Sequence, residues 1–256
     1  LKYIKRGNWY CLWNVNQFFK KNIKLVHSKG VLYLVSTPIG NLGDISYRAV
    51  RTLKNVYLIA AEDTRHSKKL LNHYEIKTKM ISYFEHNRNI RIPFLIDNLI
   101  NGLSIAIITD AGTPGISDPA YKLIRSAIGA GVKIESIPGP SALLAALTSS
   151  GLPTDRFLFE GFLPPKKGRN KRLNKVKDID ATIIYYESAK RLKRTLNQLY
   201  ESFGDRPAVL ARELTKKFEE VKRGTLLQLF NYYSENQAKG ECVILIGKSD
   251  KNVYFK

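Results

Sequence analysis

Asp110-Ala-Gly-Thr-Pro-Gly-Ile-Ser-Asp118-Pro119 is the stretch of sequence on which the fold of this chain depends. It follows Ser104-Ile-Ala-Ile-Ile-Thr109, a short β-branched run that predicts a buried strand, and it precedes residues 120–128, whose apolar spacing predicts a helix. Asp118 suits the N-cap of that helix, and Pro119 suits its first position. Open α/β sheets bind ligands in loops of this kind, at the carboxyl ends of parallel strands. We therefore expect a ligand-binding loop here.

The loop does not match the common nucleotide-binding fingerprints. The chain contains neither G-x-G-x-x-G nor G-x-x-x-x-G-K-[ST]. A second turn rich in Gly and Pro, Pro138-Gly-Pro-Ser-Ala142, joins a predicted strand at 132–137 to a predicted helix at 143–147. Two such turns predict a ligand site of another kind.

Apolar runs alternate with helical patterns along most of the chain. Further strands are predicted at residues 31–36, 56–61, 80–83, 181–186, 207–211 and 241–246. Further helices are predicted at 45–53, with Asp44 as its cap, at about 88–99, at 191–200 and at 226–233. This alternation predicts an α/β fold of two domains, residues 31–152 and 157–249, each centred on a mostly parallel or mixed sheet.

The composition limits the classes of function. The 256 residues include 42 Lys and Arg against 22 Asp and Glu, a formal net charge of +20. Such an excess predicts a polyanionic partner, nucleic acid before a membrane surface, although a biased genome composition also explains part of it. No apolar run approaches the roughly 18 residues of a membrane span. The two cysteines and four histidines form no metal-binding spacing, so we predict no structural metal and a reducing, cytoplasmic compartment.

Residues 1–29 differ from the rest because they contain several Lys and Arg but no Asp or Glu. They match neither a transit peptide nor a secretory signal. We expect this basic leader to be poorly ordered.

The polar cluster Glu62-Asp-Thr-Arg-His66 follows a predicted buried strand. Charged residues at the end of such a strand favour a functional site. Asp63 and Thr64 are also good N-caps, so a simple helix start explains the cluster equally well.

With these features in view, the chain resembles the tetrapyrrole methylase superfamily and, within it, the 16S ribosomal RNA cytidine-2′-O-methyltransferases. The phrases that carry the resemblance occur in family order between residues 31 and 247. They are STPIGNLGDI (36–45), LIAAEDTRHSKKLL (58–71), DAGTPGISDP (110–119), IPGPSAL (137–143), GLPTDRFLFEGFLPPKKGR (151–169), YYES (185–188), ARELTKKFEEVKRGT (211–225) and KGE (239–241).

The resemblance implies that S-adenosylmethionine binds in a cleft between two α/β domains, usually in a homodimer. Many members continue into a further C-terminal segment, so an RNA contact made there is in doubt. The positions expected to hold the cofactor are Ile39, Gly112, Thr113, Pro114, Ile116, Ser141, Ala142, Tyr186, Ala211 and Gly240.

A ribose 2′-hydroxyl is a poor nucleophile at neutral pH, so we expect a general base or a strongly oriented hydroxyl. The candidate bases are Asp63, Asp110, Glu62 and Glu213. Expected RNA contacts, on the small ribosomal subunit, are Arg65, Lys166, Lys167, Arg169, Lys171, Arg172 and Arg212. Arg65 and Arg212 can instead pair with Glu62 and Glu213, and a basic run is often only a solvated face.

Two other functions fit parts of the sequence. A methyltransferase for a tetrapyrrole or another small molecule would share the fold and the cofactor, but it has less need of a basic surface. A ribosome-associated RNA-binding protein without turnover would not need an intact ligand loop.

Overall fold

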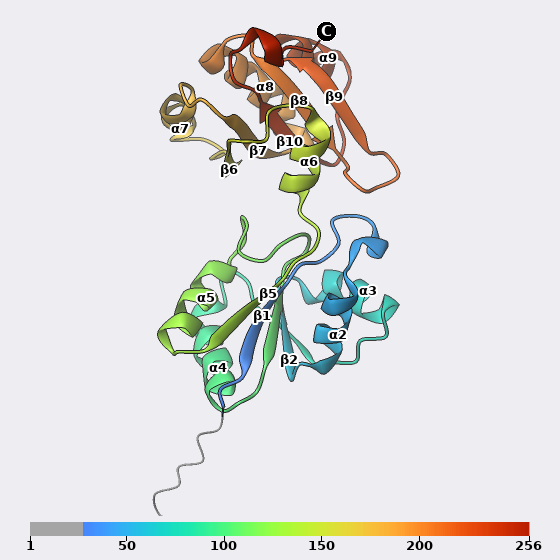
Figure 1. The fold of residues 1–256 in the computed structure, drawn as a ribbon, viewed down its shortest axis with the longest axis vertical. Helices are drawn as coiled ribbons and strands as arrows, with labels where there is room; N and C mark the ends of the chain where they lie inside the picture. Colours follow the sequence, from blue (N-terminus) through green and yellow to red (C-terminus); the bar gives the residue numbers. More distant parts are fainter. Residues whose placement is uncertain (1–27, 256) are drawn as a thin grey trace, which may run out of the picture.

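The structure is a computed structural model that describes residues 28–255, and it contains two five-stranded sheets, each covered by helices. Figure 1 shows the two sheets stacked along the long axis of the molecule, with the N-terminal sheet below the C-terminal one. The predicted α/β class is confirmed. The predicted leader lies outside the described residues except for Ser28 and Lys29.

The N-terminal sheet is entirely parallel, in the order β3-β2-β4-β1-β5. Its strands are β1 (Val31–Val35), β2 (Leu58–Ala61), β3 (Met80–Ser82), β4 (Ile105–Ile108) and β5 (Lys133–Ile137). Its helices are α2 (Tyr47–Asn55), α3 (Thr64–His73), α4 (Arg88–Ile100) and α5 (Ala120–Gly129), with a 3₁₀ turn at Leu42–Asp44. Helices α2 and α3 cover one face and α4 and α5 the other, so the central strands are apolar throughout.

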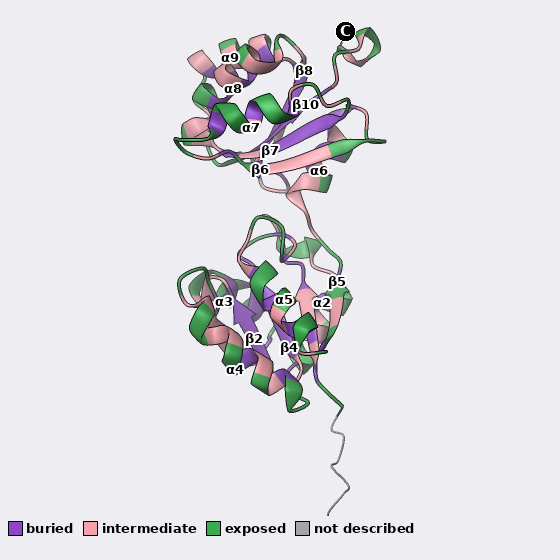
Figure 2. Cartoon of the chain, turned by 90° about the vertical axis from the view of Figure 1, so that its left-hand side faces the viewer, coloured by how far each residue is buried: buried purple, intermediate pink, exposed green. Residues whose placement is uncertain are grey.

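The C-terminal sheet is mixed, in the order β6-β7-β10-β8-β9. Only β6 and β7 pair in parallel, and the other pairs are antiparallel. Its strands are β6 (Phe157–Phe162), β7 (Thr182–Ser188), β8 (Pro207–Arg212), β9 (Glu220–Thr225) and β10 (Glu241–Ile246). Its helices are α6 (Ala142–Ser150), α7 (Arg169–Val176), α8 (Ala189–Phe203) and α9 (Leu226–Glu235), with a 3₁₀ turn at Lys251–Val253. Figure 2 shows the largely buried central strands of this sheet in purple.

Helix α6 connects the two halves. It follows β5 of the N-terminal sheet, but Ala146 and Leu147 on its buried face pack against Ile184, Val209 and Leu245 of the C-terminal sheet. The division at residues 152 and 157 stays a prediction. The packing gives the C-terminal sheet a helix on its second face.

Several local predictions need correction. Ser46, not Asp44, caps α2, since its side chain accepts a hydrogen bond from the Ala49 amide. Pro119 is the N-cap of α5, and Asp118 lies one residue earlier, where it accepts from the Ala120 amide at 2.8 Å. No sequence pattern above predicts β6, β9 or α7.

Candidate functional site

A cavity of about 430 Å³ lies between the two sheets. Its N-terminal wall comes from segments that follow β1, β2, β4 and β5, which places it at the carboxyl ends of the parallel strands, as the ligand-binding rule predicts. The residues of this wall are Ile39, Glu62, Thr109, Asp110, Ala111, Gly112, Thr113, Ile116, Ser117, Asp118, Ser141 and Ala142. The C-terminal wall consists of Phe162, Tyr186, Glu187, Leu214, Lys216, Glu241, Cys242 and Val243.

The loop after β4 is joined to the loop after β1 by an antiparallel bridge between Thr37 and Gly112. The two amides donate to the opposite carbonyls at 2.9 and 3.0 Å. The buried Thr37 hydroxyl also donates to the Thr109 carbonyl at 3.1 Å. Gly112 has a φ of +85°, a conformation that favours glycine. The bridge therefore fixes the backbone that a ligand would contact.

Thr113 connects this loop to the segment after β5. Its hydroxyl accepts a hydrogen bond from the Ser36 hydroxyl and donates to the Pro140 carbonyl, both at 3.1 Å. Three strand-end segments are thereby held in one arrangement. Ser141, at the N-cap of α6, makes no capping hydrogen bond with its side chain, so its hydroxyl is available at the cavity.

Two candidate bases, Glu62 and Asp110, face the cavity together. Glu62 Oε2 accepts from the Thr109 hydroxyl at 2.6 Å, and Asp110 Oδ1 accepts from the Asp63 amide at 3.0 Å. Burial raises the pKa of the Asp110 carboxyl, and the neighbouring Glu62 adds to the rise against the hydrogen bond from Asp63. Asp110 is thus a better proton acceptor than an ordinary aspartate.

Asp63 has a different role. It is the N-cap of α3, accepting from the Arg65 amide at 2.8 Å, and it pairs with the Arg65 guanidinium at 2.9 Å. These hydrogen bonds lower the pKa of Asp63 to about 2. Asp63 does not line the cavity. The helix-start interpretation of the 62–66 cluster is thus confirmed for Asp63, whereas Glu62 lines the cavity and its functional role stays a prediction. The ion pair of Arg65 is with Asp63, not Glu62.

On the opposite wall, Tyr186 contacts the start of helix α6. Its hydroxyl accepts from the Leu143 amide at the start of α6 at 3.0 Å. Its ring meets the rings of Phe159 and Phe162 edge-on, with centroids 4.8 and 5.5 Å away. Leu214 and Val243 add apolar surface, so this wall suits a flat apolar group.

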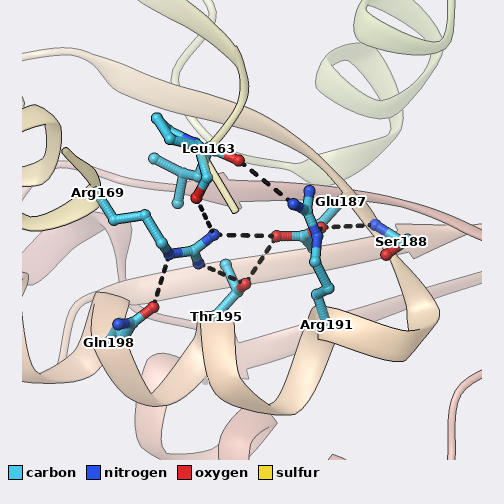
Figure 3. A network of polar contacts seen from close by, with 8 residues as sticks. Leu163, Arg169, Glu187, Ser188, Arg191, Thr195 and Gln198 are labelled. Atoms are coloured by element: carbon cyan, nitrogen blue, oxygen red, sulfur yellow. Dashed lines mark hydrogen bonds and ion pairs between the residues drawn. The ribbon is translucent and has the colours of Figure 1, made fainter. Parts of the chain in front are cut away.

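Behind this wall lies a buried ionic network, shown in Figure 3. The Glu187 carboxylate, which lines the cavity, accepts from Arg191 Nε at 2.6 Å and from the Thr195 hydroxyl at 2.7 Å. Arg169 lies 3.9 Å from the same carboxylate and donates to Thr195 and Gln198. Only 3% of Arg169 is exposed, so the predicted RNA contact at this residue is wrong: its guanidinium braces the fold.

Glu213 is also a structural residue in this molecule. It has a φ of +49°, and its carboxylate accepts from Lys216 Nζ at 3.0 Å and from the Glu241 amide at 3.2 Å. Burial would raise its pKa, but these donors lower it overall. A Cβ at Gly240 would stand 2.0 Å from Glu213 Oε1, so Gly240 leaves room for this carboxylate. Glu213 does not line the cavity.

Three of the expected cofactor positions also lie outside the cavity lining. Ala211 is fully buried in β8 beside Val243, and Gly240 and Pro114 stand next to lining residues. The other seven line it: Ile39, Gly112, Thr113, Ile116, Ser141, Ala142 and Tyr186.

The remaining basic residues lie outside the cavity lining. Lys166, Lys167 and Lys171 are exposed on and before α7, whereas Arg172 pairs with Glu160 at 2.6 Å. Arg212 pairs with Glu220 on the neighbouring strand, not with Glu213. Within residues 28–255, no group of His, Cys, Asp and Glu could hold a metal ion, and no helix is long and apolar enough to span a membrane.

Sequence reasoning missed several lining residues. Glu187 and Lys216 lie within the phrases YYES and ARELTKKFEE, but the sequence alone assigns neither residue a role. Asp118 was interpreted only as a helix cap. For Glu187 and Lys216 the missing signal is long-range, since their partners are far away in the sequence or in another element.

Comparisons with known proteins agree with this geometry. The model of the family "Tetrapyrrole (Corrin/Porphyrin) Methylases" matches residues 31–229. A ribosomal RNA small subunit methyltransferase I from Halalkalibacterium halodurans is 52% identical over 225 residues, which cover 87% of this chain and 78% of that protein. The protein of the same name from Synechocystis sp. is 50% identical over 226 residues, which cover 87% and 81%.

Among solved structures, a cobalt precorrin-4 methyltransferase superposes with a TM-score of 0.65 at 17% identity, covering 85% of this chain and 94% of that one. A uroporphyrin-III C-methyltransferase from Thermus thermophilus complexed with S-adenosyl homocysteine gives 0.61 at 18% identity, covering 86% and 98%. These structures share the fold. The chain thus belongs to the tetrapyrrole methylase family and, within it, to the group of the ribosomal RNA small subunit methyltransferases I.

Proposed function

We propose that this protein is an S-adenosylmethionine-dependent methyltransferase that methylates the ribose 2′-hydroxyl of a cytidine in the 16S RNA of the small ribosomal subunit. The observation that carries the proposal is the cavity between the two halves, in which the partly buried carboxylates of Glu62 and Asp110 face an apolar, aromatic wall. The names of the relatives and the S-adenosyl homocysteine in the Thermus thermophilus structure support the choice of substrate and cofactor.

The lining residues fit S-adenosylmethionine. The volume is within the range of small-molecule sites. Gly112 lines the cavity without a side chain, and Ser141 offers a free hydroxyl, which suits the methionine and ribose ends of the cofactor. Tyr186, Leu214 and Val243 suit the adenine. Ala211, Gly240 and Pro114 do not line the cavity, but they would hold the neighbouring lining residues in place. When bound, the cofactor supplies an activated methyl group on a sulfonium.

Most of the acceleration would come from positioning. Holding the ribose in line with the methyl group and excluding water can lower the barrier by about 7–11 kcal/mol. Asp110 would accept the proton of the 2′-hydroxyl while Glu62 holds the strand end through Thr109, and a positioned base adds about 10²–10⁴-fold. Asp63 and Glu213, which are engaged elsewhere, are not proposed as bases.

The RNA would bind across the exposed lysines near α7, Lys166, Lys167 and Lys171, with Arg65 and Arg172 at the margins. The net charge of +20 supports this, and binding should weaken steeply with salt. We further propose that the enzyme acts as a homodimer, and in the cytoplasm, where ribosomes are assembled.

The test is methyl transfer from labelled S-adenosylmethionine to small ribosomal subunits that lack the modification, followed by nuclease mapping of the product. Label on one cytidine ribose of the small-subunit RNA is the expected result. Cofactor binding without label on RNA would contradict the proposal and favour a small-molecule acceptor.

A further inference from the structure

The loop between β8 and β9 is built as a rigid tip. Glu213 and Thr215 adopt positive φ values of +49° and +65°, which is unusual for residues other than glycine. Three hydrogen bonds hold this conformation. Lys216 Nζ donates to the Glu213 carboxylate, the Thr215 amide donates to the Glu219 carboxylate, and the Lys216 amide donates to the Glu213 carbonyl. Residues in such strained conformations persist only where the surroundings impose them, and they cluster at functional sites.

The same loop is attached to the N-terminal half. The Asn41 amide donates to the Thr215 hydroxyl at 3.1 Å, and a Cβ at Gly40 would stand 2.4 Å from Lys216 Cγ. In Figure 1 the β8–β9 hairpin reaches down beside the blue loop that follows β1. Contacts from both halves therefore fix the tip relative to the cavity.

Lys216 places this tip at the cavity edge. It is the only Lys or Arg that lines the cavity among residues 28–255. Its ammonium contacts Glu213 and the exposed Glu241, both at 3.0 Å. The next two residues, Lys217 and Phe218, are exposed.

Phe218 is exposed by 67% on this rigid tip. Lys217 Nζ stands 5.7 Å from the centre of its ring. A strained, doubly anchored loop that presents an aromatic ring beside lysines is the combination that binds unstacked bases, because the ring stacks on the base while the ammonium contacts the phosphate. A single exposed aromatic residue would carry no such meaning without the lysines and the adjoining cavity.

We propose that Phe218 stacks on an RNA base next to the target cytidine, and that Lys217 contacts a phosphate of the same strand. The inference rests on the proposed function. The exposed lysines near α7 follow β6, at one edge of the C-terminal sheet, whereas the tip precedes β9, at the other edge. The cavity is lined by Phe162 at the end of β6 and by Lys216, so a strand bound to both basic regions crosses the cavity.

The experiment compares Phe218→Leu, Phe218→Tyr and Lys217→Ala with the wild type. The substrate is the small ribosomal subunit that lacks the modification. Binding to the particle, binding of S-adenosylmethionine and steady-state methyl transfer are measured separately. Phe157→Leu is the matched control, since Phe157 is also exposed but lies at the opposite end of β6 from the cavity.

Phe218→Leu should weaken binding to the particle and raise the KM for it by about tenfold, while cofactor affinity stays unchanged. Phe218→Tyr should remain near the wild type, because stacking needs an aromatic ring and leucine supplies only apolar bulk. Lys217→Ala should weaken binding less and flatten its salt dependence.

Equal affinities of Phe218→Leu and wild type for the particle would overturn the inference, as would an equal loss in Phe157→Leu or a change of oligomeric state. Because binding and turnover are measured apart, the two proposals can fail separately. Weakened binding of Phe218→Leu with no methyl transfer by the wild type would contradict the proposed function and leave the stacking contact supported.

Discussion

The two walls of the cavity are built in different ways. The N-terminal wall consists of strand-end loops held by backbone and hydroxyl contacts, such as the Thr37–Gly112 bridge, and it carries Asp110 with its raised pKa. The C-terminal wall consists of strand side chains, and Glu187 is held from behind by a buried ionic network. This difference predicts that substituting Asp110 in the first wall changes turnover, whereas breaking the network behind Glu187 in the second wall changes stability.

The largest effect should come from Asp110→Asn, which should lower methyl transfer by about 10²–10⁴-fold. Stability should not fall. The pKa of Asp110 is raised in the folded protein, so its stabilising effect is present below the ordinary value of 3.8 and is lost as the pH rises through the folded pKa. At pH 7 the charged Asp110 carboxylate therefore adds no stability, and replacing it with a neutral amide should not lower the free energy of unfolding. Steady-state assays and urea unfolding measure both quantities, with the exposed Asp97→Asn on α4 as the control. A parallel loss of stability would contradict the account.

On the other wall, Glu187→Gln should lower the free energy of unfolding by about 3–5 kcal/mol, because it leaves the charge of the buried Arg169 uncompensated. Urea unfolding measures this. The double variant Glu187→Gln, Arg169→Met should recover part of the loss, since it removes the stranded charge. A change below about 1 kcal/mol would show that the network does not brace this wall.

A smaller effect is expected from Gly112→Ala in the first wall, about 1–3 kcal/mol in stability, together with weaker cofactor binding. A Cβ there would meet Ile39 only at 3.6 Å, so the cost comes from the φ of +85° and not from a clash. Gly129→Ala is the control, because nothing lies within 4 Å of that Cβ. Calorimetry of the cofactor and thermal unfolding compare the two variants. Equal cofactor affinity and equal thermal stability of the two variants would show that the positive φ at Gly112 is not required.

The smallest effect belongs to Asp63→Asn. Asparagine remains a good N-cap but loses the ion pair with Arg65, so turnover should stay close to the wild type and stability at neutral pH should fall only slightly. The hydrogen bonds from Arg65 lower the pKa of Asp63 from 3.8 to about 2, so its stabilising effect is present above 3.8 and is lost as the pH falls toward 2. The variant should therefore show a flatter pH dependence of unfolding in that range. A collapse of turnover like that of Asp110→Asn would instead make Asp63 catalytic.

The sequence predicts the N-terminal half better than the C-terminal half, for a physical reason. Strands that are buried on both faces have short, continuous apolar sequences, which are easy to recognise. The loop from Asp110 to Asp118 indicates the end of the sheet at which a ligand is expected to bind. Strand β9, at a sheet edge, contains Lys222 and Arg223 and lacks an apolar run. Helix α7 lies in a basic segment whose only buried apolar residues are Leu173 and Val176, so it lacks the apolar periodicity that predicts a helix.

The site follows the same rule. The turns rich in glycine and proline are local signals that predict a ligand loop, and the resemblance to the family then predicts individual positions such as Ile39, Gly112 and Ser141. The burial of Arg169 depends on Glu187 and Gln198, which are 18 and 29 residues away along the chain. No local sequence pattern predicts these contacts. The partners of charged residues are the part of the site that only the folded chain determines.

The most direct test of the account is a crystal structure of the protein with S-adenosyl homocysteine. The account predicts that the ligand lies in the cavity between the two sheets, against the loop of Gly112 and Thr113 on one side and against Tyr186 on the other. Binding elsewhere, or contact with only one of the two walls, would contradict the central claim that both halves build one cofactor site.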